Sequence, residues 1–179
     1  MQIQWSHCVL RVRDLDAMVS FYGDMFGLRE SDRGLLGPKG PEIVFMSGRS
    51  SDHHQIAFSP TRSEEEASSL DHIAFRVEAL GDVRDTWQRL TDDDRASGVM
   101  PLTHGNAISV YFHDPEKNGI EVFCDTPWHV KQPQLKVWDP TQSDEEVMAF
   151  VENKFRDSPE FGSMADYQAE RARAFGESS

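Results

Sequence analysis

Two histidines occupy equivalent positions of a repeated segment and could bind one metal ion together. His7 opens the run His-Cys-Val-Leu-Arg-Val, and His72 opens the run His-Ile-Ala-Phe-Arg-Val 65 residues further along. A single strand histidine is usually a packing or surface residue, but two at one repeat position would face each other across a pseudo-twofold axis. Because neutral imidazole is the commonest metal ligand in proteins, the pair favours a metal over a duplicated packing histidine.

Glu121 is the third candidate ligand, since it stands between two apolar residues. A buried carboxylate needs a cation, either a metal or an arginine such as Arg11 or Arg76. The offset of 65 makes Ile56 the counterpart of Glu121, so the repeat offers no fourth ligand. Two histidines and one carboxylate are typical of non-haem Fe(II) oxygenases, and a three-ligand zinc site is the alternative.

The elements that must position these residues form two copies of a βαβββ module, over 1–60 and 70–125. Each copy opens on a strand with period-two alternation, at 6–12 and 71–77, and continues into a helix with apolar residues at helical spacing. Further strands are expected near 28–31, 42–47 and 53–58, and near 98–102, 106–113 and 118–124. With a helix on one face of each sheet, the free faces are expected to form a cup. The predicted fold class is therefore α+β, with a cup-shaped mixed sheet.

The chain beyond residue 125 does not continue the sequence pattern of the two modules. We interpret residues 1–125 as one domain and 126–179 as a helical C-terminal extension. The segment Ser-Asp-Glu-Glu at 143–146 is a capping box that predicts a helix to about residue 155, and a second helix is expected over 163–175. The extension is expected to pack on the body or on a partner subunit, in a homodimer or a larger homo-oligomer.

Composition and charge exclude several partners. The 179 residues carry a net charge of −13, and an acidic surface repels phosphate backbones and anionic lipids. Neither nucleic acid nor membrane is therefore an expected partner. No run approaches the roughly 20 apolar residues of a membrane helix, and the first residues lack the regions of a signal peptide. Two cysteines, Cys8 and Cys124, do not make a disulfide framework, so a cytoplasmic location is expected.

Four further motifs carry a family resemblance. They are Leu-Asp-His-Ile-Ala-Phe at 70–75, His-His-Gln-Ile-Ala-Phe at 53–58, His-Gly at 104–105 and Tyr-Phe-His-Asp-Pro-Glu-Lys-Asn-Gly-Ile-Glu-Val at 111–122. Together with the repeat, they resemble the vicinal oxygen chelate superfamily of glyoxalase I, fosfomycin and bleomycin resistance proteins, and type I extradiol catechol dioxygenases. Over about residues 5–125, the chain is most similar to the dioxygenases, in a short form without their extra N-terminal pair of modules.

The resemblance implies an extradiol dioxygenase that opens the ring of a small aromatic diol with O2. It implies Fe(II) as the cofactor, with Mn, Zn or Ni as other possible ions. The implied roles are metal ligands for His7, His72 and Glu121, acid and base for His54, and contacts to the substrate hydroxyls for His104 and Tyr111.

The position of His54 also has support from the strand pattern. On a strand, His54 shares a face with Ile56, and Ile56 is the offset counterpart of a proposed ligand. We therefore expect His54 beside the metal without binding it, the alternative being a polar strand start. The aromatic residues considered for the cavity are Phe45, Phe112, Phe123 and Trp128.

Three other functions fit the same fold. A metal-dependent glyoxalase or epimerase generally uses a fourth protein ligand, which Ile56 does not supply. A metal-free drug-binding resistance protein need not keep His7, His72 and Glu121 together. A subunit-assembly module acting through the acidic tail is the third alternative.

Overall fold

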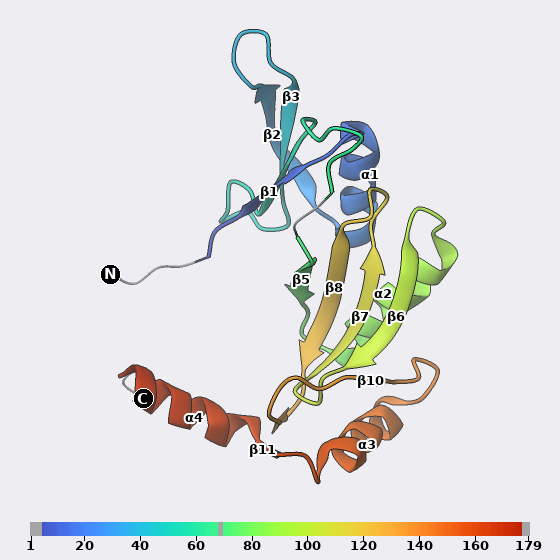
Figure 1. The fold of residues 1–179 in the computed structure, drawn as a ribbon, viewed down its shortest axis with the longest axis vertical. Coiled ribbons are helices and arrows are strands. Elements are labelled where there is room, and N and C mark those ends of the chain that lie inside the picture. The colour runs from blue at the N-terminus through green and yellow to red at the C-terminus, as the bar shows by residue number, and fades with distance from the viewer. Residues whose placement is uncertain (1–4, 68–69, 177–179) are drawn as a thin grey trace. The chain divides into compact units, whose positions relative to one another are not determined.

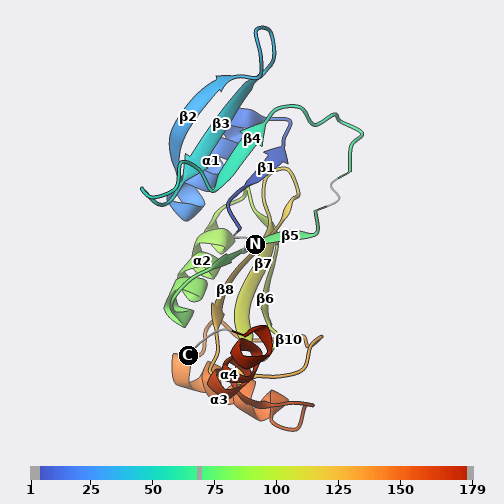
Figure 2. The same cartoon turned by 90° about the vertical axis from the view of Figure 1, so that its left-hand side faces the viewer.

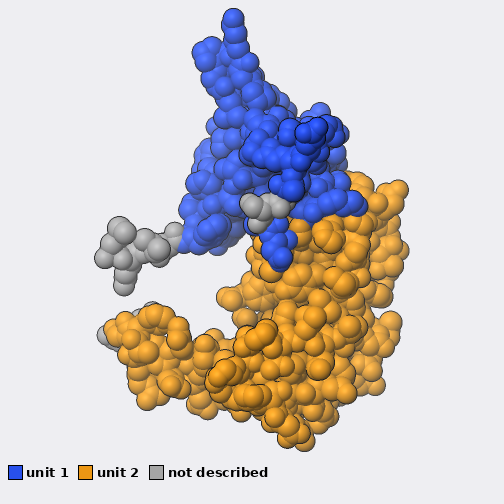
Figure 3. Space-filling model, in the orientation of Figure 1, with its two compact units in different colours: residues 1–71, 114–118 blue, residues 72–113, 119–179 orange. Residues whose placement is uncertain are grey.

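The computed structural model describes residues 5–67 and 70–176, and these form two compact units (Figure 3). Unit 1 comprises residues 1–71 and 114–118, and unit 2 comprises 72–113 and 119–179. Both expected βαβββ modules are present, and their sheets combine parallel and antiparallel pairs, which confirms the α+β fold class. The cup and the domain boundary at residue 125 stay predictions.

Unit 1 holds a four-stranded sheet with one helix on it (Figure 2). The strand order is β1-β4-β3-β2, and β1 pairs with β4 in parallel. The strands are β1 (Cys8–Arg11), β2 (Arg29–Leu35), β3 (Glu42–Ser47) and β4 (Ile56–Ser59). Helix α1 (Leu15–Phe26) begins after Asp14, whose side chain accepts from the Ala17 N–H, and ends at Gly27 with a φ of 67°. Asp14 thus caps the first turn, and Gly27 ends the helix because glycine adopts the left-handed conformation at no steric cost.

Alternation along the strands decides which side of the unit 1 sheet meets the helix. Leu10 is buried, whereas Val9 and Arg11 on either side of it are exposed. The Phe58 ring of β4 packs on the Tyr22 ring of α1, with centroids 4.8 Å apart. The apolar face therefore lies on α1, and the opposite face of the sheet is open.

Unit 2 repeats this plan in a five-stranded sheet of order β10-β6-β7-β8-β5 (Figure 1). The strands are β5 (His72–Arg76), β6 (Ser97–Thr103), β7 (Ala107–His113), β8 (Gly119–Asp125) and β10 (Lys136–Val137). Strand β5 runs parallel to β8, and helix α2 (Leu80–Asp92) packs on β6, β7 and β8. Ile120 and Val122 of β8, with Val110 of β7, are almost fully buried and form the side of the sheet that meets α2.

The C-terminal extension contributes both strands and helices to unit 2. A small sheet pairs β9 (Trp128–His129) with β11 (Gly162–Ser163), while β10 joins the edge of the main sheet. Helix α3 (Asp144–Phe155) starts at the expected capping box, and it buries Val147, Val151 and Phe155. Helix α4 (Met164–Phe175) starts at the expected place but has no buried residue. In the described part of the chain, no helix has the length and apolar character needed to cross a membrane.

Candidate functional site

The open face of the unit 2 sheet gathers four of the predicted site residues. Glu121 of β8 lies opposite Ala74 of β5 on one side and opposite Tyr111 of β7 on the other. Residues opposite each other in a sheet share a face, and so do residues two apart along a strand. His72 therefore lies on the same face as Glu121 and Tyr111, away from α2.

The Glu121 carboxylate is buried among polar groups. The residue is only 7% exposed, and its Oε1 accepts a hydrogen bond of 2.6 Å from the hydroxyl of Ser109. Its Oε2 lies 3.5 Å from Nε2 of His72, and its Oε1 lies 3.9 Å from Nε2 of His104. A buried carboxylate needs such partners, because removal of its charge from water is costly.

The arginines that were the alternative partners of Glu121 bind other carboxylates. Arg76 lies 3.3 Å from Asp125 and stacks over the Phe123 ring, whereas Arg11 pairs with Glu66. The imidazole of His72, and not a guanidinium, is thus the nearest basic group to Glu121. This arrangement leaves an acidic oxygen and a ring nitrogen side by side, and transition metals such as iron and zinc accept both donors.

His104 and Tyr111 form a hydrogen-bonded pair beside the carboxylate. Nε2 of His104 lies 3.0 Å from the Tyr111 hydroxyl, and the rings meet edge to face. The Tyr111 ring also packs edge-on against His72, with centroids 5.3 Å apart. These contacts bring together every predicted site residue of unit 2.

A cavity of about 410 Å³ opens over this face. Three predicted site residues line it, together with Phe123, which was a predicted cavity aromatic; the full lining is Arg76, His104, Asn106, Ala107, Tyr111, Glu121, Phe123, Asp125 and Gln132. Of the other predicted cavity aromatics, Phe112 is wrong, and Trp128 is not among the residues that line this cavity. Phe112 is 2% exposed on the α2 side of β7, and Trp128 stacks on Phe161 in the extension.

The sequence interpretation missed the polar lining of this cavity. Strand alternation could have identified Arg76 and Asp125, because each lies an even number of residues from a predicted ligand on its own strand. Gln132 lies in the extension, in a segment without strand or helix periodicity, and no sequence signal pointed to it.

In unit 1, His54 lies beside His7 and Phe45. The His7 and His54 ring centroids are 4.2 Å apart, and the Phe45 ring packs on His54 at 4.9 Å. Nδ1 of His54 also lies 2.9 Å from Nδ1 of His53. Burial, and then the neighbouring His7 and His53, lower the pKa of His54 below that of an ordinary histidine. A lowered pKa favours the neutral ring, which can accept a proton.

The strand argument for His54 rested on a wrong premise. Ile56 is 2% exposed and shares the α1 side of β4 with Phe58, so it does not face the open side. His54 precedes β4, in a segment without strand geometry, so alternation from Ile56 does not reach it. His54 meets Phe45 instead through the path of this loop.

The repeat offset also changes by one residue at the last strand of each module. In unit 1 Cys8 pairs with Ile56, whereas in unit 2 its counterpart Ile73 pairs with Ile120. The structural counterpart of Glu121 is therefore Ala57, opposite Val9, and not Ile56. Because alanine cannot bind a metal either, the expectation of three protein ligands is unaffected.

The three predicted metal ligands are divided between the units. His7 belongs to unit 1, and His72 and Glu121 belong to unit 2. Within the described residues of either unit, no group of three histidine, cysteine, aspartate or glutamate side chains is arranged to hold a metal ion. The donor chemistry nevertheless fits a divalent metal, since a buried carboxylate lies against an imidazole nitrogen. The complete ligand set stays a prediction.

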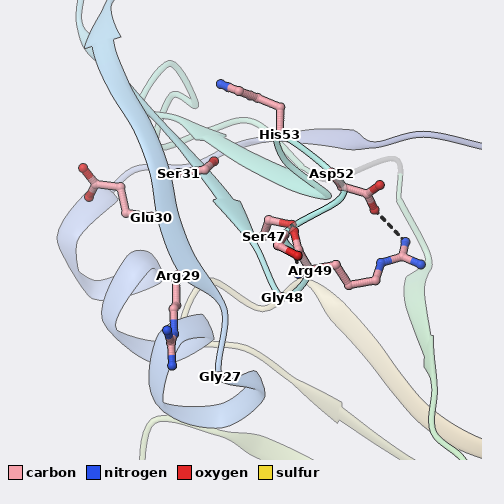
Figure 4. Close-up of a pocket in the computed structure, with 10 residues that line it drawn as sticks. Gly27, Arg29, Glu30, Ser31, Ser47, Gly48, Arg49, Asp52 and His53 are labelled. Carbon is pink, nitrogen blue, oxygen red and sulfur yellow. Dashed lines mark hydrogen bonds and ion pairs between the residues drawn. The ribbon is translucent and has the colours of Figure 1, made fainter.

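A second cavity, of about 520 Å³, lies in unit 1 beside the start of β2 and the loop after β3 (Figure 4). Its lining is polar and includes Arg29, Glu30 and His53. Figure 4 shows Arg49 turned toward Asp52, and these two residues form an ion pair of 2.7 Å. The predicted site residues His7 and His54 are not among its lining residues.

Comparison with known proteins identifies relatives of this chain. The family described as Glyoxalase/Bleomycin resistance protein/Dioxygenase superfamily matches residues 4–122. Biphenyl-2,3-diol 1,2-dioxygenase 3 of Rhodococcus globerulus is 29% identical over 126 residues, which cover 67% of this chain and 62% of the relative. Metapyrocatechase of Pseudomonas sp. (strain CF600) is 22% identical over 138 residues, covering 76% of this chain and 44% of the relative. The chain thus spans about half the length of these curated relatives.

Solved structures share the fold. A domain from Frankia sp. EAN1pec, titled glyoxylase/bleomycin resistance protein/dioxygenase, has a TM-score of 0.58 at 20% identity, covering 70% of this chain and 94% of that one. The fosfomycin resistance protein FosX of Listeria monocytogenes, in complex with Mn(II) and sulfate, has a TM-score of 0.55 at 21% identity, covering 70% and 95%. A possible glyoxalase from Bacillus cereus has a TM-score of 0.53 at 27% identity, covering 69% and 100%.

Proposed function

Because this chain belongs to the Glyoxalase/Bleomycin resistance protein/Dioxygenase superfamily, we propose that it is an extradiol dioxygenase that opens the ring of an aromatic diol with O2. The curated relatives named as a biphenyl-2,3-diol dioxygenase and a metapyrocatechase support this reaction class. The proposal includes Fe(II) as the cofactor, with Mn(II), Zn(II) or Ni(II) as other ions that the same donors accept. The homo-oligomer and the cytoplasmic location expected from the sequence remain predictions.

The observation that carries the proposal is the buried carboxylate of Glu121 beside the partly exposed imidazole of His72. The carboxylate oxygen and the imidazole nitrogen lie 3.5 Å apart on the open face of the sheet, beside a cavity large enough for an aromatic ring. A carboxylate placed in this way suits a cation better than an apolar ligand, since its charge is largely removed from water. The proposal adds His7 of unit 1 as the third ligand of the same ion.

When bound, Fe(II) would supply coordination sites for the diol and for O2 and a path for electrons between them. The protein would hold the diol by its hydroxyl groups. Tyr111 and His104 carry the hydrogen-bonding atoms for this task, because their side chains line the cavity next to Glu121. The contact between their side chains, 3.0 Å from Nε2 of His104 to the Tyr111 hydroxyl, would help to orient the two ring hydroxyls before reaction.

His54 is the proposed proton carrier. Burial and the neighbouring His7 and His53 lower the pKa of His54, which favours the neutral ring; that form can take a proton from the bound diol and return it when the oxygen–oxygen bond breaks. A carbon–carbon bond next to the two hydroxyls breaks in this reaction. Both oxygen atoms of O2 enter the product, as an aldehyde and a carboxylate.

The isomerase alternative has less support. A glyoxalase or epimerase of this superfamily generally has a fourth protein ligand in the other module, where this chain carries Ala57. A metal-free binding protein does not require a buried carboxylate beside a histidine. These alternatives predict different results in the following experiment.

The test is anaerobic purification of the full chain with metal analysis, followed by biphenyl-2,3-diol and a panel of catechols in the presence of ¹⁸O2. We expect iron to co-purify, oxygen to be consumed in proportion to the diol, and two ¹⁸O atoms to appear in a yellow ring-opened product. An iron-loaded protein that consumes no oxygen with any diol would refute the proposal. Bound zinc or nickel with isomerase activity would favour the glyoxalase alternative.

A further inference from the structure

The segment that follows β9 makes direct contact with His104, although it lies outside the residues that match the family. Nδ1 of His104 lies 2.6 Å from the backbone carbonyl oxygen of Gln134, 30 residues further along the chain. We propose that this segment of the C-terminal extension is part of the site, and that Gln132 is a positioning residue which holds His104 in a single tautomer.

The Gln134 contact determines where the proton of His104 resides. A backbone carbonyl only accepts hydrogen bonds, so Nδ1 must carry the hydrogen and donate it. In the neutral ring, Nε2 is then unprotonated and can only accept. Nε2 lies 3.0 Å from the Tyr111 hydroxyl, which therefore donates to it. The direction of the hydrogen bonds, from Tyr111 to His104 to Gln134, is thus set by the acceptor at the end of the chain.

The Gln132 side chain links the backbone of Gln134 to the loop that carries His104. Its Nε2 donates to the His104 carbonyl oxygen at 2.8 Å and lies within 3.2 Å of Oδ1 of Asn106. Its Oε1 accepts from the Gln134 N–H at 3.1 Å. One side chain thus bonds the backbone of both His104 and Gln134, the two residues whose separation decides the 2.6 Å contact. Gln132 also lines the cavity together with His104 and Tyr111.

Two other features favour a specific contact over a chance one. The Gly105 N–H donates to the Thr103 hydroxyl, and the His104 N–H donates to the Ala107 carbonyl oxygen. The loop that carries His104 is therefore held by residues of β6 and β7. On the other side, the Lys131 N–H donates to the Pro159 carbonyl oxygen, which anchors the extension. Each segment is thus anchored to its own surroundings, and the Gln132 side chain is the link that bonds the backbone of one to the backbone of the other.

The test is the tautomer of His104 in the metal-free full chain, from long-range ¹H–¹⁵N correlation spectra with ¹⁵N-histidine. The spectra are recorded at pH 8, where an ordinary imidazole is neutral. The His104→Asn variant identifies the resonances. We expect His104 of the wild type as the Nδ1–H tautomer alone, and Gln132→Glu to produce a mixture that includes the Nε2–H tautomer. The substitution has this effect because a carboxylate has no N–H to donate to the His104 carbonyl oxygen, and its negative charge repels that oxygen.

A matched control is Gln168→Glu, the same chemical change at an exposed residue of α4, which should leave the His104 signals unchanged. Gln132→Ala is a second variant, in case the new charge disturbs folding. An Nε2–H tautomer in the wild type would overturn the Gln134 contact. A His104 signal that is identical in both Gln132 variants and the wild type would overturn the role of Gln132.

Turnover supplies a second readout, which rests on the proposed function. In the iron-loaded protein, Gln132→Glu should lower kcat on the order of 10-fold, as is common for residues that orient an active-site histidine. A changed tautomer with unchanged kcat would overturn the positioning role for His104 in catalysis. If the wild type has no diol activity at all, the proposed function fails while the tautomer result still stands or falls by itself.

Discussion

Replacement of Glu121 by glutamine should remove most of the stabilisation that a bound metal gives to the protein. The change keeps the shape of the side chain, and the amide oxygen can still accept from the Ser109 hydroxyl that now lies 2.6 Å away. It removes the negative charge that lies 3.5 Å from Nε2 of His72. The fold should therefore persist while the affinity for a divalent ion falls.

The expected magnitude follows from linkage. At a metal concentration 1,000-fold above Kd, binding stabilises the folded state by about 4.1 kcal/mol. If loss of the carboxylate weakens binding about 100-fold, the same concentration stabilises the variant by only about 1.4 kcal/mol. The difference of about 2.7 kcal/mol corresponds to a Tm lower by about 5–11 °C for a chain of this size. The metal-induced shift of each protein is its Tm with metal minus its own Tm in the presence of a chelator. An effect of the substitution on the metal-free protein therefore does not enter the comparison.

The assay is thermal unfolding across a series of Fe(II) or Mn(II) concentrations, with metal content measured in parallel. Asp125→Asn is the matched control, because it makes the same change in the same cavity on a carboxylate that is half exposed and paired with Arg76. We expect the control to keep the metal-induced shift of the wild type. An equal shift in Glu121→Gln would show that Glu121 is not a ligand and would refute the reasoning.

Three further predictions concern the proton carrier, a buried thiol and a turn. Substitution of His54 by phenylalanine should leave metal content unchanged and lower kcat by about 10²- to 10⁴-fold, whereas the exposed His113→Phe should have no effect; equal turnover in the two variants would exclude the proton role. Burial raises the pKa of the Cys124 thiol to about 11, so at pH 8 its alkylation, followed by mass spectrometry, should be about 100-fold slower than that of an ordinary thiol. Since the folded-state pKa lies above the unfolded value, the stability that Cys124 contributes is complete below pH 9 and should be lost as the pH rises toward 11. Gly105→Ala should cost about 1–3 kcal/mol in urea unfolding, because Gly105 has a φ of 84° and a Cβ there would come 3.1 Å from the Phe155 ring; unchanged stability would show that the turn can relax.

Much of the fold was predictable because it depends on local patterns. Period-two alternation located β1 and β5, and apolar residues at helical spacing located α1. The capping box at Ser143 predicted the start of α3. In each case the signal lies within a few residues of the structure it specifies, so tertiary contacts do not have to be known.

The pair of Glu121 and His72 was also accessible from the sequence. Both residues interrupt or border apolar runs on strands of one module. The structure adds that the first and last strands of that module pair in parallel. Alternation then puts both side chains on the face opposite the helix. The prediction needed only the strand positions and the fact that a helix covers one face.

The repeat did not predict the strand register correctly. The offset of 65 residues holds for the first strands and fails by one at β4 and β8, which replaces Ile56 by Ala57 as the counterpart of Glu121. A shift of one residue moves every side chain of a strand to the other face. The length of the loop before β4 decides this shift, and nothing in the sequence of that loop specifies how many of its residues join the strand.

The sequence by itself determined the two modules, their helices and the acidic and basic side chains that share the open face of unit 2, since all of these follow from periodicities of two and 3.6 residues. Only the tertiary structure decided that Gln132 and Gln134 meet His104. These contacts join segments about 30 residues apart, and each pairs a side chain with a backbone carbonyl oxygen, an acceptor that every residue carries and no sequence pattern distinguishes.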